Sequence, residues 1–76
     1  MAQAAAVEIA QARELVRSGR AQAIRERNHL SRSEIARGVG VHEATVGRWE
    51  SGTREPRGEA AIRLGRLLHE LAAITL

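Results

Sequence analysis

Arginine is the side chain that gives this sequence its chemistry. All twelve basic residues are Arg and all nine acidic residues are Glu, which leaves a net charge of +3 on 76 residues. A guanidinium group is planar and carries paired N–H donors, so it can bind a phosphate or the edge of a guanine through two hydrogen bonds at once. This modest basic excess favours an anionic partner.

The sequence offers no recognisable catalytic or metal-binding pattern. The three histidines, His29, His42 and His69, have spacings that fit no compact metal site, and no cysteine accompanies them. We find no arrangement of Ser, His and carboxylate, and no glycine-rich phosphate loop after a strand. Because a core this small can hardly exclude water from a reacting group, we expect no enzyme activity, no metal and no cofactor.

Helices must position the arginines, because the hydrophobic residues are almost entirely aliphatic. The chain supports one small core, so we expect a single all-α domain over residues 1–76. Residues 3–17 lack Gly and Pro and predict an N-terminal helix. Ser18-Gly19 interrupts it, and residues 20–28 form either a second helix or the rest of a bent one. We expect this segment to end at Asn28-His29, because Asn tolerates the left-handed conformation.

A short helix is predicted after this corner. Ser31 and Glu34 have the spacing of a capping box, in which the hydroxyl accepts from the Glu34 amide and the carboxylate accepts from the Ser31 amide. The helix ends at residues 38–40, where glycine permits positive φ. Its inward residues are Ile35, Ala36 and Val39.

A second short helix follows the glycine turn, from about Glu43 to Ser51. Val46 and Trp49 are three residues apart and are expected on its inner face. Gly52 follows its last turn and favours an end there. The two short helices therefore meet at a glycine turn, with Trp49 as a core residue.

The last predicted helix follows a loop that contains the only proline, Pro56, at or near the first turn of the helix. Residues four and three apart form one continuous apolar stripe: Ala60, Leu64, Leu67, Leu68, Leu71 and Ile74. The N-terminal helix can cover this stripe within one chain, or the stripe can pair two chains, and we slightly favour a homodimer through the terminal helices. No stretch approaches the roughly 20 apolar residues of a membrane span.

Residues 24–56, IRERNHLSRSEIARGVGVHEATVGRWESGTREP, resemble the phage repressor and Cro-like (XRE-type) helix-turn-helix family. The resemblance rests on a Leu-Ser corner, a Gly-Val turn and a Thr-Val-x-x-Trp-Glu-x-Gly helix, and it covers roughly residues 20–68. It implies a lambda-repressor-like bundle of about five helices, with the helix from 3 to 17 as an addition. The helix that starts near His42 would lie in the major groove of double-stranded DNA.

The resemblance also assigns roles to individual residues. It implies base reading by His42, Glu43, Ala44 and Arg48. It implies a phosphate contact from Arg32. We also expect phosphate contacts from Arg54 and Arg57, in the loop after Gly52, with Thr45 and Ser51 as weaker candidates. Arg25 and Glu50 match a structural ion pair of the family. Glu43 can alternatively favour the helix N-terminus through the helix dipole rather than read a base.

These features together predict a sequence-specific DNA-binding transcriptional regulator, Cro-like in size, that represses by occupying an operator. We expect it in the cytoplasm of a bacterial or phage-infected cell, with no small-molecule effector. Two alternatives stay open. One is an antitoxin-type protein that binds a toxin and regulates its own operon, and the other is an excisionase-like architectural DNA-binding factor.

Overall fold

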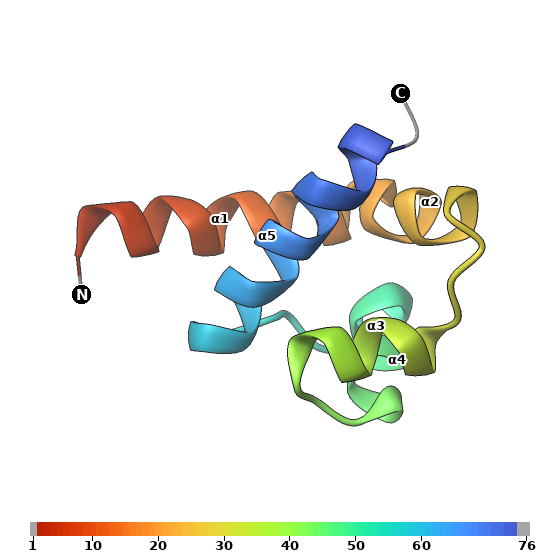
Figure 1. Ribbon diagram of the computed structural model, residues 1–76. Coiled ribbons are helices and arrows are strands. Elements are labelled where there is room, and N and C mark those ends of the chain that lie inside the picture. Colours follow the sequence, from red (N-terminus) through yellow and green to blue (C-terminus); the bar gives the residue numbers. More distant parts are fainter. Residues whose placement is uncertain (1, 75–76) are drawn as a thin grey trace.

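Five α-helices follow one another along the chain, and the computed structural model describes residues 2–74 (Figure 1). They are α1 (Gln3–Arg17), α2 (Arg20–Arg27), α3 (Arg32–Val39), α4 (Glu43–Ser51) and α5 (Gly58–Ile74). The described residues contain no strand, so the prediction of an all-α bundle of about five helices is confirmed. The ends of the predicted 1–76 domain, residue 1 and residues 75–76, lie outside the described residues.

The first two helices are separate, which decides between the two predicted alternatives. Gly19 has φ 83°, a left-handed conformation that glycine adopts without a Cβ clash. The Ser18 amide still donates to the Glu14 carbonyl at 3.0 Å, so α1 is complete before the break. α1 and α2 consequently run along the same edge of the molecule in succession (Figure 1).

The end of α2 differs from the prediction. Asn28 has φ −90°, whereas the left-handed residue is His29, with φ 58°. The Asn28 side-chain amide donates to the Ile24 carbonyl at 2.8 Å, one turn back in the same helix. The expectation that Asn28 takes the left-handed conformation is therefore wrong. Its side chain caps a carbonyl of α2, and the following histidine makes the turn, a residue type that also visits this region.

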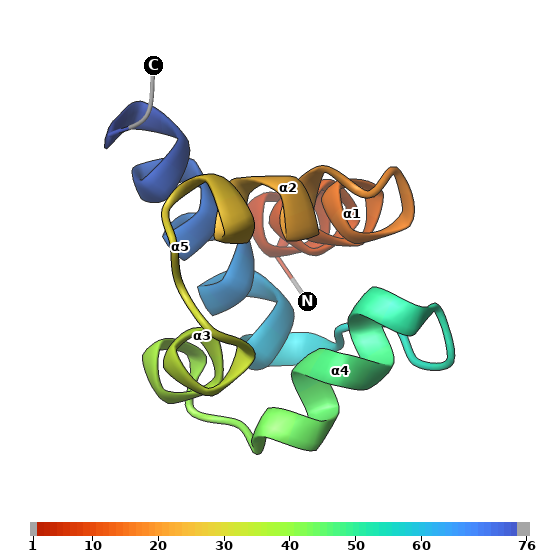
Figure 2. The same ribbon diagram turned by 90° about the vertical axis from the view of Figure 1, so that its right-hand side faces the viewer.

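The core lies where α5 crosses between α1–α2 on one side and α3–α4 on the other (Figure 2). Val46 and Trp49 are buried, as predicted for the inner face of α4. The main buried cluster consists of Ala21, Ile35, Ala36, Val39, Val46, Trp49, Leu64 and Leu68. A smaller cluster of Ile9, Ala12 and Ala61 joins α1 to α5. One aromatic side chain and many aliphatic ones thus fill the interior.

The buried face of α5 is placed differently from the predicted stripe. Leu64 and Leu68 are buried as expected, but Ala61 is fully covered and Ala60 only partly. α5 packs against α1 as well as against the short helices, so its buried surface is turned toward both. Ile74, predicted on the buried stripe, is 74% exposed because the last turn of α5 projects past its neighbours (Figure 1). Within residues 2–74, no helix is long and apolar enough to cross a membrane.

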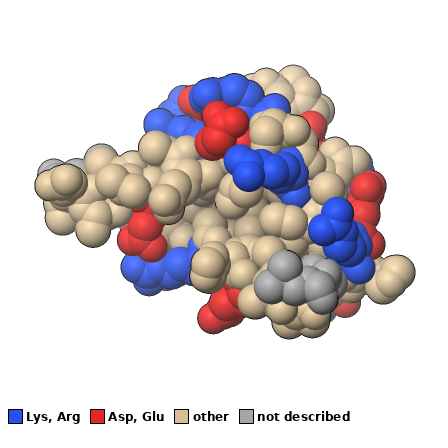
Figure 3. All heavy atoms as spheres, turned by 90° about the horizontal axis from the view of Figure 1, so that it is seen from above, with Lys and Arg blue, Asp and Glu red and all other residues tan. Residues whose placement is uncertain are grey.

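Charge is mixed on the side of the molecule away from α4. Figure 3 views this side from above, and Arg and Glu side chains are interspersed over it. Arg66 of α5 donates to Glu8 of α1 at 2.8 Å, so these two charges are paired across the two helices. A surface with interspersed charges of both signs is a poor match to a polyanion.

Candidate nucleic-acid interface

Helix α4 has one buried face and one exposed face. Val46 and Trp49 are 3% and 4% exposed and belong to the same cluster as Leu64 and Leu68 of α5. The other face presents all four predicted base-reading residues to solvent: His42, Glu43, Ala44 and Arg48. The buried face fixes the orientation of α4, so the exposed residues are held together on one outward surface.

Both ends of α4 are defined by backbone contacts. His42 precedes the helix in an extended conformation, and its carbonyl accepts the Thr45 amide at 3.0 Å. The His42 side chain makes no capping hydrogen bond, so its imidazole stays available at the start of the helix. At the other end Gly52 has φ 81°, and the Arg48 carbonyl accepts the Thr53 amide at 3.0 Å. The helix therefore has fixed limits.

Helix α3 is set against α4 by its own caps. The Ser31 hydroxyl accepts the Glu34 amide at 3.0 Å, and the Glu34 carboxylate accepts the Ser31 amide at 2.9 Å. This is the predicted capping box, and it is confirmed. Gly40 has φ 89°, and its amide donates to the Ala36 carbonyl at 2.8 Å, which closes α3 and starts the turn. The cap and the turn together fix how the two short helices meet.

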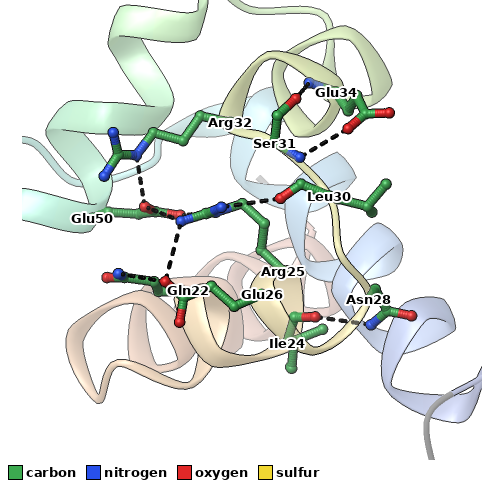
Figure 4. A network of polar contacts seen from close by, with 10 residues as sticks. All are labelled: Gln22, Ile24, Arg25, Glu26, Asn28, Leu30, Ser31, Arg32, Glu34 and Glu50. Carbon is green, nitrogen blue, oxygen red and sulfur yellow. Dashed lines mark hydrogen bonds and ion pairs between the residues drawn. The ribbon is translucent and has the colours of Figure 1, made fainter.

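An ion pair braces the corner behind α4 (Figure 4). Arg25 of α2 donates through Nε to Oε2 of Glu50 at 2.6 Å, and through Nη2 to Oε1 at 3.0 Å. Its Nη1 donates to the Leu30 carbonyl at 3.0 Å. The two side chains are only 12% and 9% exposed. One arginine thus ties α2, the corner before α3 and the last turn of α4 together.

The same carboxylate also holds Arg32, which the local sequence pattern did not indicate. Arg32 Nε donates to Oε1 of Glu50 at 2.9 Å, across 18 residues of sequence (Figure 4). Its side chain is 50% exposed, and its Nη groups make no hydrogen bond to residues 2–74. Glu50 therefore lies between a largely covered arginine, Arg25, and a half-exposed one, Arg32. The Arg32 guanidinium is thus held through Nε, while its Nη groups remain available for another acceptor.

The pKa values follow from these contacts. Burial acts to raise the pKa of Glu50, but the hydrogen bonds from Arg25 and Arg32 outweigh it and leave that pKa below its ordinary value. The hydrogen bond to Glu50 raises the pKa of Arg25. The Ser31 amide lowers the pKa of Glu34 by hydrogen bonding to its carboxylate. All of these groups are charged at neutral pH.

The other predicted phosphate contacts lie on or next to α4. Arg54 and Arg57 are exposed in the loop between α4 and α5, and neither forms an ion pair with any residue from 2 to 74. Ser51 is exposed, and its hydroxyl donates to the Arg48 carbonyl at 3.2 Å. Thr45 is half-buried. Arg48 likewise forms no ion pair with the described residues, so α4 and its loop present three guanidinium groups without an ion-pair partner within residues 2–74.

Two arginines of α1, Arg13 and Arg17, contact this loop and were not predicted to do so. Arg13 Nε donates to the Pro56 carbonyl at 2.9 Å, and Arg17 Nη2 donates to Oε1 of Glu55 at 3.0 Å. The residues in each pair are about forty positions apart in sequence. Helical periodicity places a residue on a face but does not identify such a distant partner, so no local signal could have found these contacts.

The all-helical fold, the capped glycine turn and the half-exposed α4 define a helix-turn-helix protein. A helix-turn-helix family model matches residues 22–71, about two thirds of the chain. The protein belongs to this family, in its XRE-type, Cro- and C1-like branch, and carries a DNA-binding domain of transcription regulators. No curated protein and no solved structure matches the chain. Among the described residues, no cluster of His, Cys, Asp or Glu could hold a metal ion.

Proposed function

We propose that this protein is a sequence-specific repressor that binds double-stranded DNA by inserting α4 into the major groove. The observation that carries the proposal is the exposure of His42, Glu43, Ala44 and Arg48 on the face of α4 opposite its buried residues. Bound at an operator, it blocks transcription by occupancy. Such a regulator acts in the cytoplasm of a bacterial or phage-infected cell, where its DNA lies.

Base reading is assigned chiefly to Arg48. Its guanidinium has no ion-pair partner within residues 2–74 and can donate to O6 and N7 of one guanine. Ala44 can contact a thymine methyl group, and Glu43 can accept from the amino group of a cytosine. His42 adds an imidazole at the entrance of the helix. A good bidentate contact contributes about 1–3 kcal/mol of discrimination against the wrong base.

Phosphate contacts are assigned to Arg32, Arg54 and Arg57, with Ser51 and Thr45 as weaker contributors. Arg32 stands at the first turn of α3, where the helix dipole adds partial positive charge. Its bond to Glu50 orients the side chain before DNA arrives. Each arginine that neutralises a phosphate should contribute about 0.9 to the slope of log affinity against log salt.

Selection of bound sequences from a random DNA pool tests this function directly. Wild-type protein should enrich one motif, and Arg48→Ala should lose the preference at one position while retaining non-specific binding. Arg20→Ala is the matched control, since it removes the same charge from a residue that lines the hollow between α1, α2 and α5, away from α4. An unchanged motif with Arg48→Ala would exclude Arg48 as a base reader. No enrichment by wild-type protein would overturn the proposed function.

The enriched motif also tests the proposed homodimer through the terminal helices. Val7 in the first half of α1 and Ile74 in the last turn of α5 are large apolar residues that stay 47% and 74% exposed in one chain, so each terminal helix leaves an apolar side chain that a second chain could cover. A symmetric dimer reads two half-sites about one helical turn apart, so the motif should be a palindrome. Sedimentation of the protein on that DNA should give two chains per site. A single asymmetric site with one bound chain would contradict the dimer.

A further inference from the structure

Helix α1 lies outside the matched helix-turn-helix residues, 22–71, yet it reaches the loop that follows α4. Arg13 donates to the Pro56 carbonyl at 2.9 Å, and Arg17 forms an ion pair with Glu55 at 3.0 Å. A hollow of about 330 Å³ lies between α1, the end of α4 and this loop. The two arginines therefore link α1 to the loop at the edge of this hollow.

The middle of the loop is held chiefly by α1. At its start, the Thr53 and Arg54 amides donate to the Arg48 carbonyl at 3.0 and 3.3 Å. At its end, the Ala61 amide donates to the Arg57 carbonyl at 3.1 Å, in the first turn of α5. Between them Pro56 is fully buried and has no N–H, so its carbonyl is its one backbone polar group. Arg13 supplies the hydrogen bond that this buried carbonyl needs.

The second contact adjusts the charge of the loop. Glu55 stands between Arg54 and Arg57, and a bare carboxylate there would repel a DNA phosphate. Arg17 pairs with it at 3.0 Å and offsets that charge. Both side chains are more than half exposed, so this pair contributes little to stability and acts mainly on the local field.

We propose that α1 is a brace for the DNA-contacting loop, with Arg13 as a positioning residue that keeps Arg54 and Arg57 ready for phosphates. The inference rests on the proposed function. A loop that is ordered before binding does not lose further conformational freedom on the DNA, so the brace raises affinity without touching a base. Arg17 supports the same loop through its charge.

Arg13→Met tests the brace, since methionine keeps an apolar stem and removes the donor. On the enriched DNA site, the affinity should fall about three- to tenfold, because the loosened loop no longer holds one of its two arginines on a phosphate. The salt slope should fall by about 0.9, the share of that contact. Arg13→Lys retains a donor and should restore most of the affinity and most of the salt slope. The base preference read by Arg48 should not change.

Arg66→Met is the matched control. It breaks an arginine contact between α1 and α5, to Glu8 at 2.8 Å, that involves no loop residue. Its affinity and salt slope should equal those of the wild type at a temperature where all variants are folded. If Arg66→Met lowers the slope as much as Arg13→Met, α1 acts through general stability and the brace is overturned.

A double-variant background separates positioning from direct contact. When Arg54 and Arg57 are both replaced by Ala, Arg13→Met should change the salt slope no further. An additional fall would mean that Arg13 binds a phosphate itself, which overturns the positioning role.

Amide hydrogen exchange of the free protein tests the brace without DNA. Arg13→Met should accelerate exchange of the Thr53 and Arg54 amides, and Arg66→Met should not. Unchanged exchange with intact DNA binding overturns the brace alone, whereas absence of wild-type DNA binding overturns the proposed function.

Discussion

Two regions of this small protein join distant segments with the same parts, an arginine–glutamate pair and a glycine. At the corner of the helix-turn-helix, Arg25 and Glu50 make two hydrogen bonds of 2.6 and 3.0 Å. Where α1 crosses α5, Arg66 and Glu8 make two of 2.8 and 3.2 Å. The geometry is alike, but the corner pair is 12% and 9% exposed and the crossing pair 67% and 31%.

The glycines of the two regions also differ in how strictly their positions require glycine. Gly40, in the turn between α3 and α4, has φ 89°, which most other residues adopt only at a cost. Gly65 is helical, and a Cβ built there would lie 3.5 Å from the Ala12 Cβ, an ordinary contact distance. The corner therefore requires particular residues, whereas the crossing requires only small ones. A recognition helix needs a fixed orientation, and these required residues lie at the corner that sets the orientation of α4.

The largest expected effect is that of Glu50→Ala. It leaves Arg25, whose side chain is only 12% exposed, without its carboxylate. Because the pair is largely but not fully covered, the cost should approach, without exceeding, that of a fully buried pair, about 3–5 kcal/mol. Urea denaturation followed by circular dichroism should show the loss as a lower midpoint. Glu8→Ala, the same change at the crossing, is the control. Equal losses for the two variants would mean that burial does not distinguish the pairs.

Acid should weaken the corner through the same carboxylate. The pKa of Glu50 is lowered in the folded state, so its contribution to stability is complete above the ordinary pKa of 4.5 and disappears as pH falls through the lower folded value. The wild type should therefore lose stability below about pH 4.5. Glu50→Gln should lose less over that range, because it has no such proton to take up. Parallel pH curves for the two proteins would contradict this assignment.

Gly40→Val tests the turn. A β-branched residue at φ 89° is strained by about 1–2 kcal/mol or more, and its side chain would approach an Arg63 nitrogen that lies 3.3 Å from the Cβ position. We expect a melting temperature lower by several degrees, measured by calorimetry. Gly40→Asn is the milder companion, since Asn tolerates this conformation. An unchanged melting temperature for the valine variant would contradict the role of the turn.

Gly65→Ala should raise the stability of the protein. The added methyl group meets Ala12 at an ordinary distance, and alanine favours a helix over glycine by about 0.8–1.0 kcal/mol. A gain of up to about 1 kcal/mol in urea denaturation is the expected result. A loss would show that α1 and α5 cannot accommodate the methyl group, and the crossing would then be as demanding as the corner.

The sequence was sufficient for features that depend on neighbours in the chain. The Ser31–Glu34 capping box, the glycine turn and the buried pair Val46 and Trp49 were all predicted, because spacing along one helix determines them. The register of α5 was predicted less well: Ile74 is exposed and Ala61 is buried. Periodicity defines a stripe, but the partners that cover it decide its centre and its end.

The candidate site divides in the same way. Local spacing and family resemblance led to the exposed residues of α4, whose roles on DNA stay predictions. They did not lead to the bond between Arg32 and Glu50 or to the contact of Arg13 with Pro56, which join residues 18 and 43 positions apart. Such contacts depend on where separate helices come to rest. The choice of Asn28 over His29 for the left-handed residue failed because an amide can also cap its own helix.

The smallest expected effect is that of Arg66→Met, and it completes the contrast with Glu50→Ala. The Glu8 carboxylate accepts two hydrogen bonds from Arg66, which lower its pKa, but both side chains are in contact with water. Water replaces most of what the pair supplies, so the loss in the free energy of unfolding should be the smallest of these effects and should shrink further in high salt. The salt dependence is the sharper measurement, because screening affects an exposed pair and hardly reaches a buried one. If 1 M salt abolishes the stability cost of Arg66→Met but leaves that of Glu50→Ala intact, burial distinguishes the two ion pairs. Equal sensitivity to salt would mean that the corner is more hydrated than its 9% exposed carboxylate indicates.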